Sequence, residues 1–339
     1  MPCIFLIETN NQKNKTMIQW GFIGCGSVTE QKSGPAFSKV DDSKVVAVMR
    51  RNADKAKDYA QRHGVGKWYS DADDLINDPE VTAVYVATPP SSHAQYAIAS
   101  MRAGKPVYVE KPMATTHAEC QEMIAVSKET GVPCYVAYYR RALPYFLKVK
   151  QLIDDGILGD ISTVQIRFEA PPHEADYNRD TLPWRVKKEI AGGGYFYDLA
   201  SHQLDILDFL FGPIQHATGY SANIAGMYDV EDTVSATFQF ESGIAGSGSW
   251  SFVSPQGINV DSIELVGTKG TLSFSTFDFS NIELETADGI KAYMEENPDN
   301  IQFSLIENIA NHLNGKGGEV VSDAVSAART NWVMEEILG

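Results

Sequence analysis

A lysine at the end of an apolar run is the side chain in this sequence that is best placed for chemistry. Glu110-Lys111-Pro112 directly follows the run 106–109, which predicts a buried strand. In open parallel sheets, ligands bind at the carboxyl ends of the strands. Pro112 fixes φ and removes a backbone donor, so the chain must turn there. Lys111 would then hold its ammonium group at the mouth of the sheet, although the tripeptide alone also fits a solvated surface lysine.

A carboxylate and an imidazole form a second candidate pair. Asp198 and His202 are four residues apart, which places both on one face of a helix. A carboxylate beside an imidazole orients the ring and stabilises its protonated form, and the preceding glycines 192–194 let backbone approach a ligand. In isolation the pair is more typical of a capping aspartate and a core histidine. Asp205 and Asp208 are interpreted as the polar side of the same amphipathic helix.

Glycines at the end of the first predicted strand favour a dinucleotide site. Gly24 allows a tight turn, and Gly26 lets a pyrophosphate approach the N-terminus of the next helix. The third small position of this fingerprint holds Thr29, which would loosen the packing of that helix. An ordinary strand-to-helix turn is the alternative. The residues expected to contact the cofactor here are Gly24, Cys25, Gly26, Ser27 and Val28.

Two arginines at the end of the second predicted strand favour NADP over NAD. NAD sites usually offer an acid here for the ribose hydroxyls, whereas Arg50 and Arg51 would match a 2′-phosphate. A solvated strand end, with NAD held by backbone contacts, remains open. The turn 88–93 follows another predicted strand and would line the nicotinamide side, with His93 a structural residue rather than a catalyst. The remaining cofactor contacts expected are Thr88, Pro89, His93, Glu110 and Lys111.

The predicted secondary structure that would position these groups differs between the first and second parts of the chain. Apolar runs at 18–23, 45–49, 84–87, 107–109 and 134–137 alternate with helical stretches at 27–40, 53–63, 92–103 and 116–130, which predicts a parallel sheet. After a helix at 143–155, a largely antiparallel sheet is predicted from strands at 161–169, 217–224, 233–241, 244–252, 262–266, 271–274 and 282–285. Further helices are expected at 197–211 and after Gln302. We predict a doubly wound α/β Rossmann domain at 17–137 and an α+β domain at 138–339 that binds substrate.

Bulk properties exclude several classes of protein. A net charge of −16 over 339 residues argues against a nucleic-acid partner. No apolar run reaches the ~20 residues of a membrane span. The four cysteines lack metal-ligand spacing and are too few for a disulfide framework, so no metal site and a reducing, cytoplasmic compartment are predicted. Residues 1–16 lack a signal peptide's basic start and are interpreted as a disordered extension.

Taken together, the motifs resemble the glucose-fructose oxidoreductase/inositol 2-dehydrogenase/rhizopine catabolism (Gfo/Idh/MocA) family. The matching stretches are 21–26 (GFIGCG), 87–93 (ATPPSSH), 103–113 (AGKPVYVEKPM) and 192–202 (GGGYFYDLASH), in the family's order. The resemblance implies a pyridine-nucleotide oxidoreductase acting on a sugar or polyol, and a large open sheet that forms homodimers or homotetramers. It implies a catalytic role for Lys111, proton transfer by His202, and orientation of substrate or histidine by Asp198.

These roles are physically consistent with the oxidation of an alcohol. His202 would exchange the hydroxyl proton, and Lys111 would stay protonated and stabilise a developing alkoxide. Residues 138–141 and Trp184-Arg185 are expected at the substrate, giving a predicted binding set of Lys111, Tyr139, Arg140, Trp184, Arg185, Asp198 and His202. The alternatives are a family member acting on a dihydrodiol or imine, and a non-catalytic NADP-binding regulator. The sequence does not specify the substrate, the reaction direction or the oligomeric state.

Overall fold

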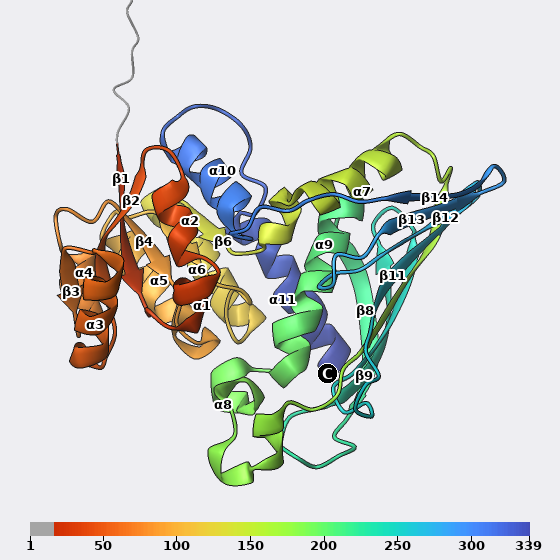
Figure 1. Ribbon diagram of the computed structural model, residues 1–339, viewed down its shortest axis with the longest axis horizontal. Helices are drawn as coiled ribbons and strands as arrows, with labels where there is room; N and C mark the ends of the chain where they lie inside the picture. The colour runs from red at the N-terminus through yellow and green to blue at the C-terminus, as the bar shows by residue number, and fades with distance from the viewer. Residues whose placement is uncertain (1–16) are drawn as a thin grey trace, which may run out of the picture.

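Two sheets organise the chain in the computed structural model, which describes residues 17–339 (Figure 1). The extension predicted at residues 1–16 lies outside the described residues. A six-stranded parallel sheet has the order β3-β2-β1-β4-β5-β6, and an eight-stranded sheet has the order β14-β13-β12-β11-β7-β10-β9-β8. The first order is that of a doubly wound Rossmann domain, whose ligand crevice opens where the order reverses, between β1 and β4. The predicted fold class is therefore confirmed.

The parallel sheet and its helices occupy the first part of the chain. Its strands are β1 (Ile18–Ile23), β2 (Ser43–Met49), β3 (Lys67–Tyr69), β4 (Ala83–Val86), β5 (Val107–Val109) and β6 (Cys134–Val136). Its helices are α1 (Ser27–Gln31), α2 (Gly34–Lys39), α3 (Ala53–His63), α4 (Ala72–Ile76), α5 (His93–Arg102) and α6 (His117–Thr130). Strands β4, β5 and β6 are buried throughout, as expected for parallel strands covered on both faces.

The prediction of one helix at 27–40 is wrong, because the structure has two short helices there. Helix α1 ends at Gln31, and α2 begins at Gly34-Pro35, where the proline suits a first helical turn. Gly34 is required at this corner, since a Cβ would overlap the Thr29 carbonyl. Thr29 does not loosen the packing as expected: it is fully buried, and its hydroxyl donates to Gly26 O at 2.9 Å.

The second sheet is mostly antiparallel, as predicted, with one parallel pair between β7 and β10. Its strands are β7 (Ile161–Glu169), β8 (Ile214–Ala222), β9 (Thr233–Phe240), β10 (Ala245–Ser251), β11 (Val260–Gly267), β12 (Gly270–Phe274), β13 (Ile282–Thr286) and β14 (Gly289–Tyr293). Burial alternates along β9, so one face packs on the core and the other faces outward. Strand β14 was not predicted, and its side chains are largely exposed, which removes the apolar signal.

Helices α9 and α11 lie between the two sheets and join them (Figure 1). The helices of this part are α7 (Pro144–Asp154), α8 (Lys188–Ala191), α9 (Ser201–Phe211), α10 (Phe303–Leu313) and α11 (Ala324–Leu338). Helix α11 contacts α6 and β6 of the first part as well as β8 and α9 of the second. The end of the chain therefore returns to the parallel sheet, and the predicted boundary at residue 138 stays a prediction.

None of the helices formed by residues 17–339 has the length and apolar character needed to cross a bilayer. Cys25, Cys120 and Cys134 are free and buried, and burial raises the pKa of the Cys25 thiol to about 11. Buried thiols of this kind are unreactive. The cytoplasmic location itself stays a prediction.

Candidate active site

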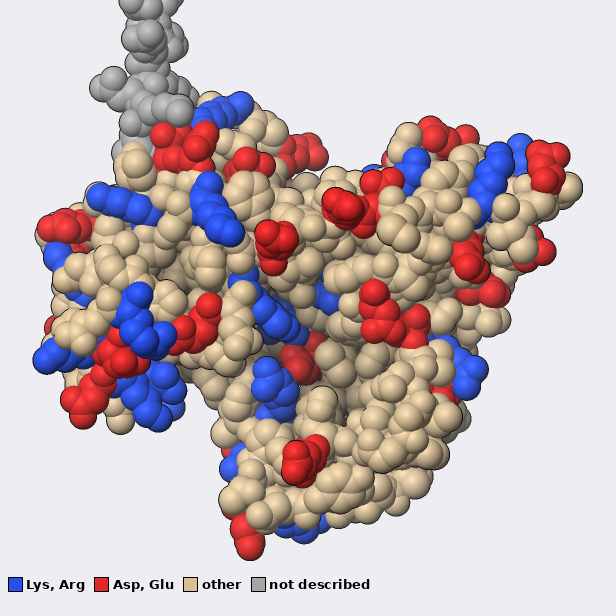
Figure 2. All heavy atoms as spheres, in the orientation of Figure 1, with Lys and Arg blue, Asp and Glu red and all other residues tan. Residues whose placement is uncertain are grey.

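A cleft of about 1020 Å³ opens where the carboxyl ends of β1, β4 and β5 face α9 and the segment before it (Figure 2). Its walls contain every site residue predicted from the sequence except His93. The lining includes Gly24, Cys25, Gly26, Ser27, Val28, Arg50, Arg51, Thr88, Pro89, Glu110, Lys111, Tyr139, Arg140, Trp184, Arg185, Asp198 and His202. One cavity thus joins the glycine turn to the groups expected to carry chemistry.

The glycine turn has the geometry that a bound dinucleotide needs. Gly24 has a φ of 94° and its N–H donates to Met49 O, and a Cβ at Gly24 would press on Ala87 and Thr88. Gly26 precedes α1 and has no heavy atom within 4 Å of where its Cβ would lie. The space in front of Gly26 is therefore open for a ligand. In Rossmann dinucleotide sites, helix N-termini and glycine turns bind the pyrophosphate.

The end of β2 presents basic side chains beside the glycine turn. Arg50 Nη1 donates to Cys25 O at 3.2 Å and so ties the strand end to the turn. Arg51 is exposed and lines the cleft. Lys55, from the first turn of α3, lies on the same wall and was missed from the sequence. Its position three residues after the N-cap Asn52 was the available signal, since the first turn of that helix lies near the strand ends.

His93 does not line the cleft, so its place among the predicted cofactor contacts is wrong. The side chain is fully buried, with Nδ1 3.0 Å from Pro112 O and Nε2 2.7 Å from Thr88 O. Burial lowers the pKa of its imidazole. His93 thus fastens the turn after β4 to the turn that follows Lys111, as its interpretation as a structural residue implied.

Lys111 reaches Asp198 across the cleft. Its Nζ lies 2.6 Å from Asp198 Oδ1 and 2.7 Å from Asp198 O, and Arg185 Nε donates to Oδ2 of the same carboxylate at 2.9 Å. Burial alone would raise the pKa of the Asp198 carboxyl, but the charges and hydrogen bonds of Lys111 and Arg185 lower it to about 2. Asp198 is therefore ionised at neutral pH and holds Lys111 in place.

The expected pairing of Asp198 with His202 is not what the structure shows. Residues Phe196–Ala200 form a π-helical turn before α9, and such a turn inserts an extra residue into the helix. The face-sharing that a spacing of four gives in a regular α-helix is lost across this turn. Both oxygens of Asp198 serve Lys111 and Arg185, and His202 receives no carboxylate from residues 17–339.

His202 is a buried, neutral imidazole. Only 4% of the residue is exposed, and the rings of Tyr138, Tyr139 and Phe277 approach it edge-on. Burial, and then the charges of Arg140, Lys111 and Lys32, hold the pKa of His202 well below its usual range. Nδ1 is enclosed without a hydrogen-bond partner among residues 17–339. The other ring nitrogen, Nε2, is therefore the one that is open to the cleft.

Glu110 supports the loop that carries Lys111. Its Oε1 accepts from Tyr85 Oη at 2.6 Å and from Gln302 Nε2 at 2.7 Å, and Gln302 also accepts from Tyr108 Oη. The link to Gln302 crosses 192 residues of sequence, so no local pattern revealed it. Other lining residues missed from the sequence are Lys32, Gln95, Tyr96, Ile190, Leu199 and Phe277.

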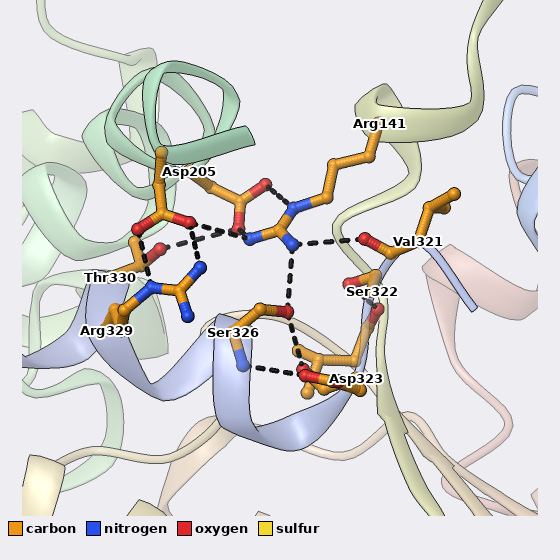
Figure 3. Close-up of polar contacts among 10 residues, drawn as sticks. Arg141, Asp205, Val321, Ser322, Asp323, Ser326, Arg329 and Thr330 are labelled. Carbon is orange, nitrogen blue, oxygen red and sulfur yellow. Dashed lines mark hydrogen bonds and ion pairs between the residues drawn. The ribbon is translucent and has the colours of Figure 1, made fainter. Parts of the chain in front are cut away.

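The four residues 138–141 divide into two pairs. Tyr139 and Arg140 line the cleft, whereas Tyr138 and Arg141 do not, contrary to expectation. Arg141 instead donates to both oxygens of Asp205 from Nε and Nη2, at 2.9 and 2.5 Å (Figure 3). The interpretation of Asp205 as the solvated side of a helix is therefore wrong.

Buried ion pairs connect the elements that carry the site residues. Arg141 Nη1 also donates to Val321 O and to Ser326 Oγ (Figure 3), and Arg329 donates to both oxygens of Asp208. Burial raises the pKa of the Asp205 carboxyl to about 6, against the opposing pull of Arg141. The network ties α9, which carries His202, to the segment after β6 and to α11.

Replacing Arg141 with methionine is expected to lower the free energy of unfolding by about 3–5 kcal/mol, because the Asp205 carboxylate would stay buried without its partner. Urea unfolding measures this loss. Arg179→Met is the matched control, since both members of the pair of Arg179 with Asp229 are exposed and such pairs contribute only about 0–1 kcal/mol. The double change Arg141→Met with Asp205→Leu should restore part of the loss. Equal small losses for Arg141→Met and Arg179→Met would contradict a stabilising buried pair.

The fold and the cleft define a class of protein: a nucleotide-dependent oxidoreductase with a Rossmann domain and a second, sheet-based domain. Residues 18–138 match the family described as "Oxidoreductase family, NAD-binding Rossmann fold", and residues 146–273 match the "GFO/IDH/MocA C-terminal domain". Together these matches span most of the described chain. The chain belongs to the Gfo/Idh/MocA family of oxidoreductases.

Individual relatives agree with this assignment. "Oxidoreductase P35" of Formosa agariphila is 40% identical over 295 residues, covering 86% of this chain and 90% of the relative. The 1,5-anhydro-D-fructose reductase of Ensifer adhaerens is 30% identical over 262 residues, covering 76% of this chain and 75% of the relative. The structure of a levoglucosan dehydrogenase with NADH and levoglucosan superimposes with a TM-score of 0.84 at 24% identity, covering 94% and 96% of the two chains. At that identity it supports the fold alone.

Proposed function

We propose that the protein transfers a hydride between a nicotinamide cofactor and a hydroxyl or carbonyl carbon of a sugar, polyol or related small molecule. One observation carries the proposal: the Lys111 ammonium and the neutral His202 imidazole line the same cleft as the glycine turn. The relative named as a 1,5-anhydro-D-fructose reductase, which is 30% identical, supports a sugar-like substrate.

The cofactor supplies a hydride acceptor or donor at its nicotinamide ring. In the oxidation direction, His202 accepts the hydroxyl proton at Nε2, the ring nitrogen open to the cleft. Lys111 donates a hydrogen bond to the same oxygen and stabilises its developing negative charge. Asp198 holds the Lys111 ammonium in position, and in the reduction direction His202 returns the proton.

A screen of polyols and aldoses with NAD⁺ and NADP⁺, followed by absorbance of the reduced cofactor, tests this function. Turnover of at least one of them, lost when Lys111 is replaced, supports the proposal. Turnover of dihydrodiols or imines alone would favour a different substrate class within the family. Saturable cofactor binding that Lys111→Ala leaves unchanged, with no turnover of any compound, would favour a non-catalytic regulator.

We further propose that NADP is preferred over NAD. Arg50, Arg51 and Lys55 line the wall where the ribose 2′-position is held in this fold, and no acid of residues 50–55 lines that wall. The Arg50 guanidinium is already oriented by Cys25 O, while Arg51 is free to turn toward a phosphate. Arginine binds phosphate bidentately.

Replacing Arg50 and Arg51 together with alanine is expected to weaken NADP binding by about 10- to 100-fold, as lost charge-assisted hydrogen bonds of about 1.5–3 kcal/mol imply. NAD binding should change much less, because NAD lacks the 2′-phosphate. Titration of each reduced cofactor by fluorescence measures both constants. Replacing Arg102, a basic residue at the end of α5 that does not line the cleft, is the control. Equal weakening of both cofactors would contradict a role at the 2′-phosphate.

We propose, finally, that the protein assembles as a homodimer or homotetramer through the outer face of the eight-stranded sheet. Along β9 and β10 the side chains on that face are exposed, small and polar, such as Ser235, Thr237 and Ser249. A flat face of this kind suits packing against a second copy. Light scattering of the purified protein measures the assembly.

A further inference from the structure

The cleft is basic in a strongly acidic protein. The chain carries a net charge of −16, yet seven Lys and Arg side chains line the cleft with only two carboxylates, Glu110 and Asp198. Figure 2 shows blue side chains gathered in the hollow between the two parts of the molecule. A local excess of positive charge attracts an anionic ligand and raises its concentration at the site.

Most of these charges have an assigned partner. Arg50, Arg51 and Lys55 stand at the nucleotide end of the cleft, where the cofactor brings phosphates. Lys111 and Arg185 share the carboxylate of Asp198. Arg140 is different, because it is a buried cation for which neither residues 17–339 nor the cofactor phosphates supply a counter-charge.

Arg140 is only 3% exposed. Its Nε donates to Thr276 O at 2.9 Å, but Nη1 is enclosed with no hydrogen-bond partner in residues 17–339. The guanidinium forms no ion pair with any residue of that range. It lies over the rings of Tyr139 and Phe277, with its central carbon 5.0 and 4.7 Å from their centroids.

The surroundings place Arg140 at the substrate end of the cleft. Thr276 and Phe277 follow β12 in the second domain, and Phe277 also contacts the ring of His202. The charge of Arg140 acts on His202, which would exchange the substrate proton. Arg50 and Arg51 follow β2, whereas Arg140 comes after β6, and three strands separate β2 from β6 in the sheet. The cofactor phosphates therefore do not neutralise this charge.

A guanidinium stays protonated in proteins and carries its donors in a rigid planar fork. Burying such a charge without a partner is unfavourable. The two aromatic rings fix its plane and leave its remaining donors for an anion such as a carboxylate, whose hydrogen bonds to a guanidinium are charge-assisted. A neutral hydroxyl would accept a hydrogen bond from one donor but would not neutralise the charge of the guanidinium.

We propose that the substrate carries a carboxylate, held by Arg140, in addition to the hydroxyl or carbonyl that reacts beside His202 and Lys111. The substrate class is therefore a sugar acid or polyhydroxy acid rather than a neutral sugar. This inference rests on the proposed function, because it places the carboxylate relative to the proposed reacting groups.

The experiment compares matched acid and neutral compounds on the complete protein. D-glucuronate and D-galacturonate are paired with D-glucose and D-galactose, and D-gluconate with D-glucitol. For each compound, kcat/KM is measured with NAD⁺ and NADP⁺, and its Kd is measured by calorimetry with the reduced cofactor bound. We expect an acid to be favoured over its neutral partner by at least about tenfold in kcat/KM or Kd, the free energy of one charge-assisted hydrogen bond.

Arg140→Gln should abolish this preference by weakening the acid about 10- to 100-fold more than the neutral partner, and Arg140→Lys, which keeps the charge, should retain part of it. Arg179→Gln, at an exposed arginine that does not line the cleft, is the control and should leave the preference as it is. Thermal unfolding of each variant checks that it is folded. Equal Kd values for acids and neutral partners, or no binding of any acid, would overturn the inference. Acid binding that depends on Arg140 without any turnover would support the carboxylate site and overturn only the proposed hydride transfer.

Discussion

Replacing Lys111 with alanine is expected to lower kcat by about 10²- to 10³-fold, the effect of removing one positioned donor to a developing oxyanion. The Lys111 ammonium lies 2.6 Å from Asp198 Oδ1, so its direction is fixed before substrate arrives. Removing it takes away stabilisation that develops mainly in the transition state, and KM should change less than kcat. Cofactor Kd should change by less than about threefold, since Asp198 keeps its bond to Arg185. Steady-state rates and fluorescence titration of the cofactor give both quantities.

Lys55→Ala is the matched control for Lys111→Ala. Both lysines line the cleft, but Lys55 stands at the nucleotide end. Its loss should weaken the cofactor and leave kcat at saturation nearly unchanged. A kcat for Lys111→Ala within a factor of three of the wild type would refute a role for this lysine at the reacting oxygen.

Replacing His202 with asparagine is expected to lower kcat by about 10²- to 10⁴-fold, the usual contribution of a positioned acid or base. Asparagine fills a similar volume but accepts no proton at neutral pH. The substrate Kd should change much less. His312→Asn is the control, because His312 is exposed on α10 and does not line the cleft. Loss of substrate binding equal to the loss of rate would assign His202 to binding instead.

The depressed pKa of His202 predicts the shape of the pH profile. Burial and the neighbouring cations keep the imidazole neutral, and the neutral form is the base. In the cofactor-bound protein, the rate of alcohol oxidation should therefore not fall at the ordinary histidine pKa near 6.5, but only at clearly lower pH. A rate that halves near pH 6.5 in wild type, and not in His202→Asn, would contradict this.

The same shift affects stability through proton linkage. Below the ordinary histidine pKa the unfolded chain binds a proton at His202 that the folded protein refuses, so this residue lowers stability as pH falls. Above that pKa, it contributes no such loss. The acid-induced decline in the unfolding free energy should accordingly be shallower in His202→Asn than in wild type.

The sequence predicted the strands of the parallel sheet well, because buried parallel strands are continuous apolar runs that end in turn residues. Strand β3 and helix α4 were missed, since three and five residues are too short to show a period. The break between α1 and α2 depends on the tight approach of Gly34 to the Thr29 carbonyl, a contact that exists only after folding.

The site residues that come directly after parallel strands could be predicted from the sequence. Lys111, Arg50 and Thr88 lie in one cleft because the carboxyl ends of parallel strands share an edge. The partner of Asp198 was not predictable, because a π-helical turn redirects this carboxylate from His202 to Lys111 and Arg185. The use of Asp205 to hold Arg141 was hidden for a different reason: Arg141 lies 64 residues away in sequence.

The carboxylate shared by Lys111 and Arg185 has a consequence for the stoichiometry of protons. Because the pKa of Asp198 is about 2, this group stays ionised throughout a turnover at neutral pH. His202 starts each cycle neutral, and it is the group through which the substrate proton would pass. In the proposed reaction, each alcohol oxidised would therefore release one proton to the solvent through His202, and Asp198 would not store it.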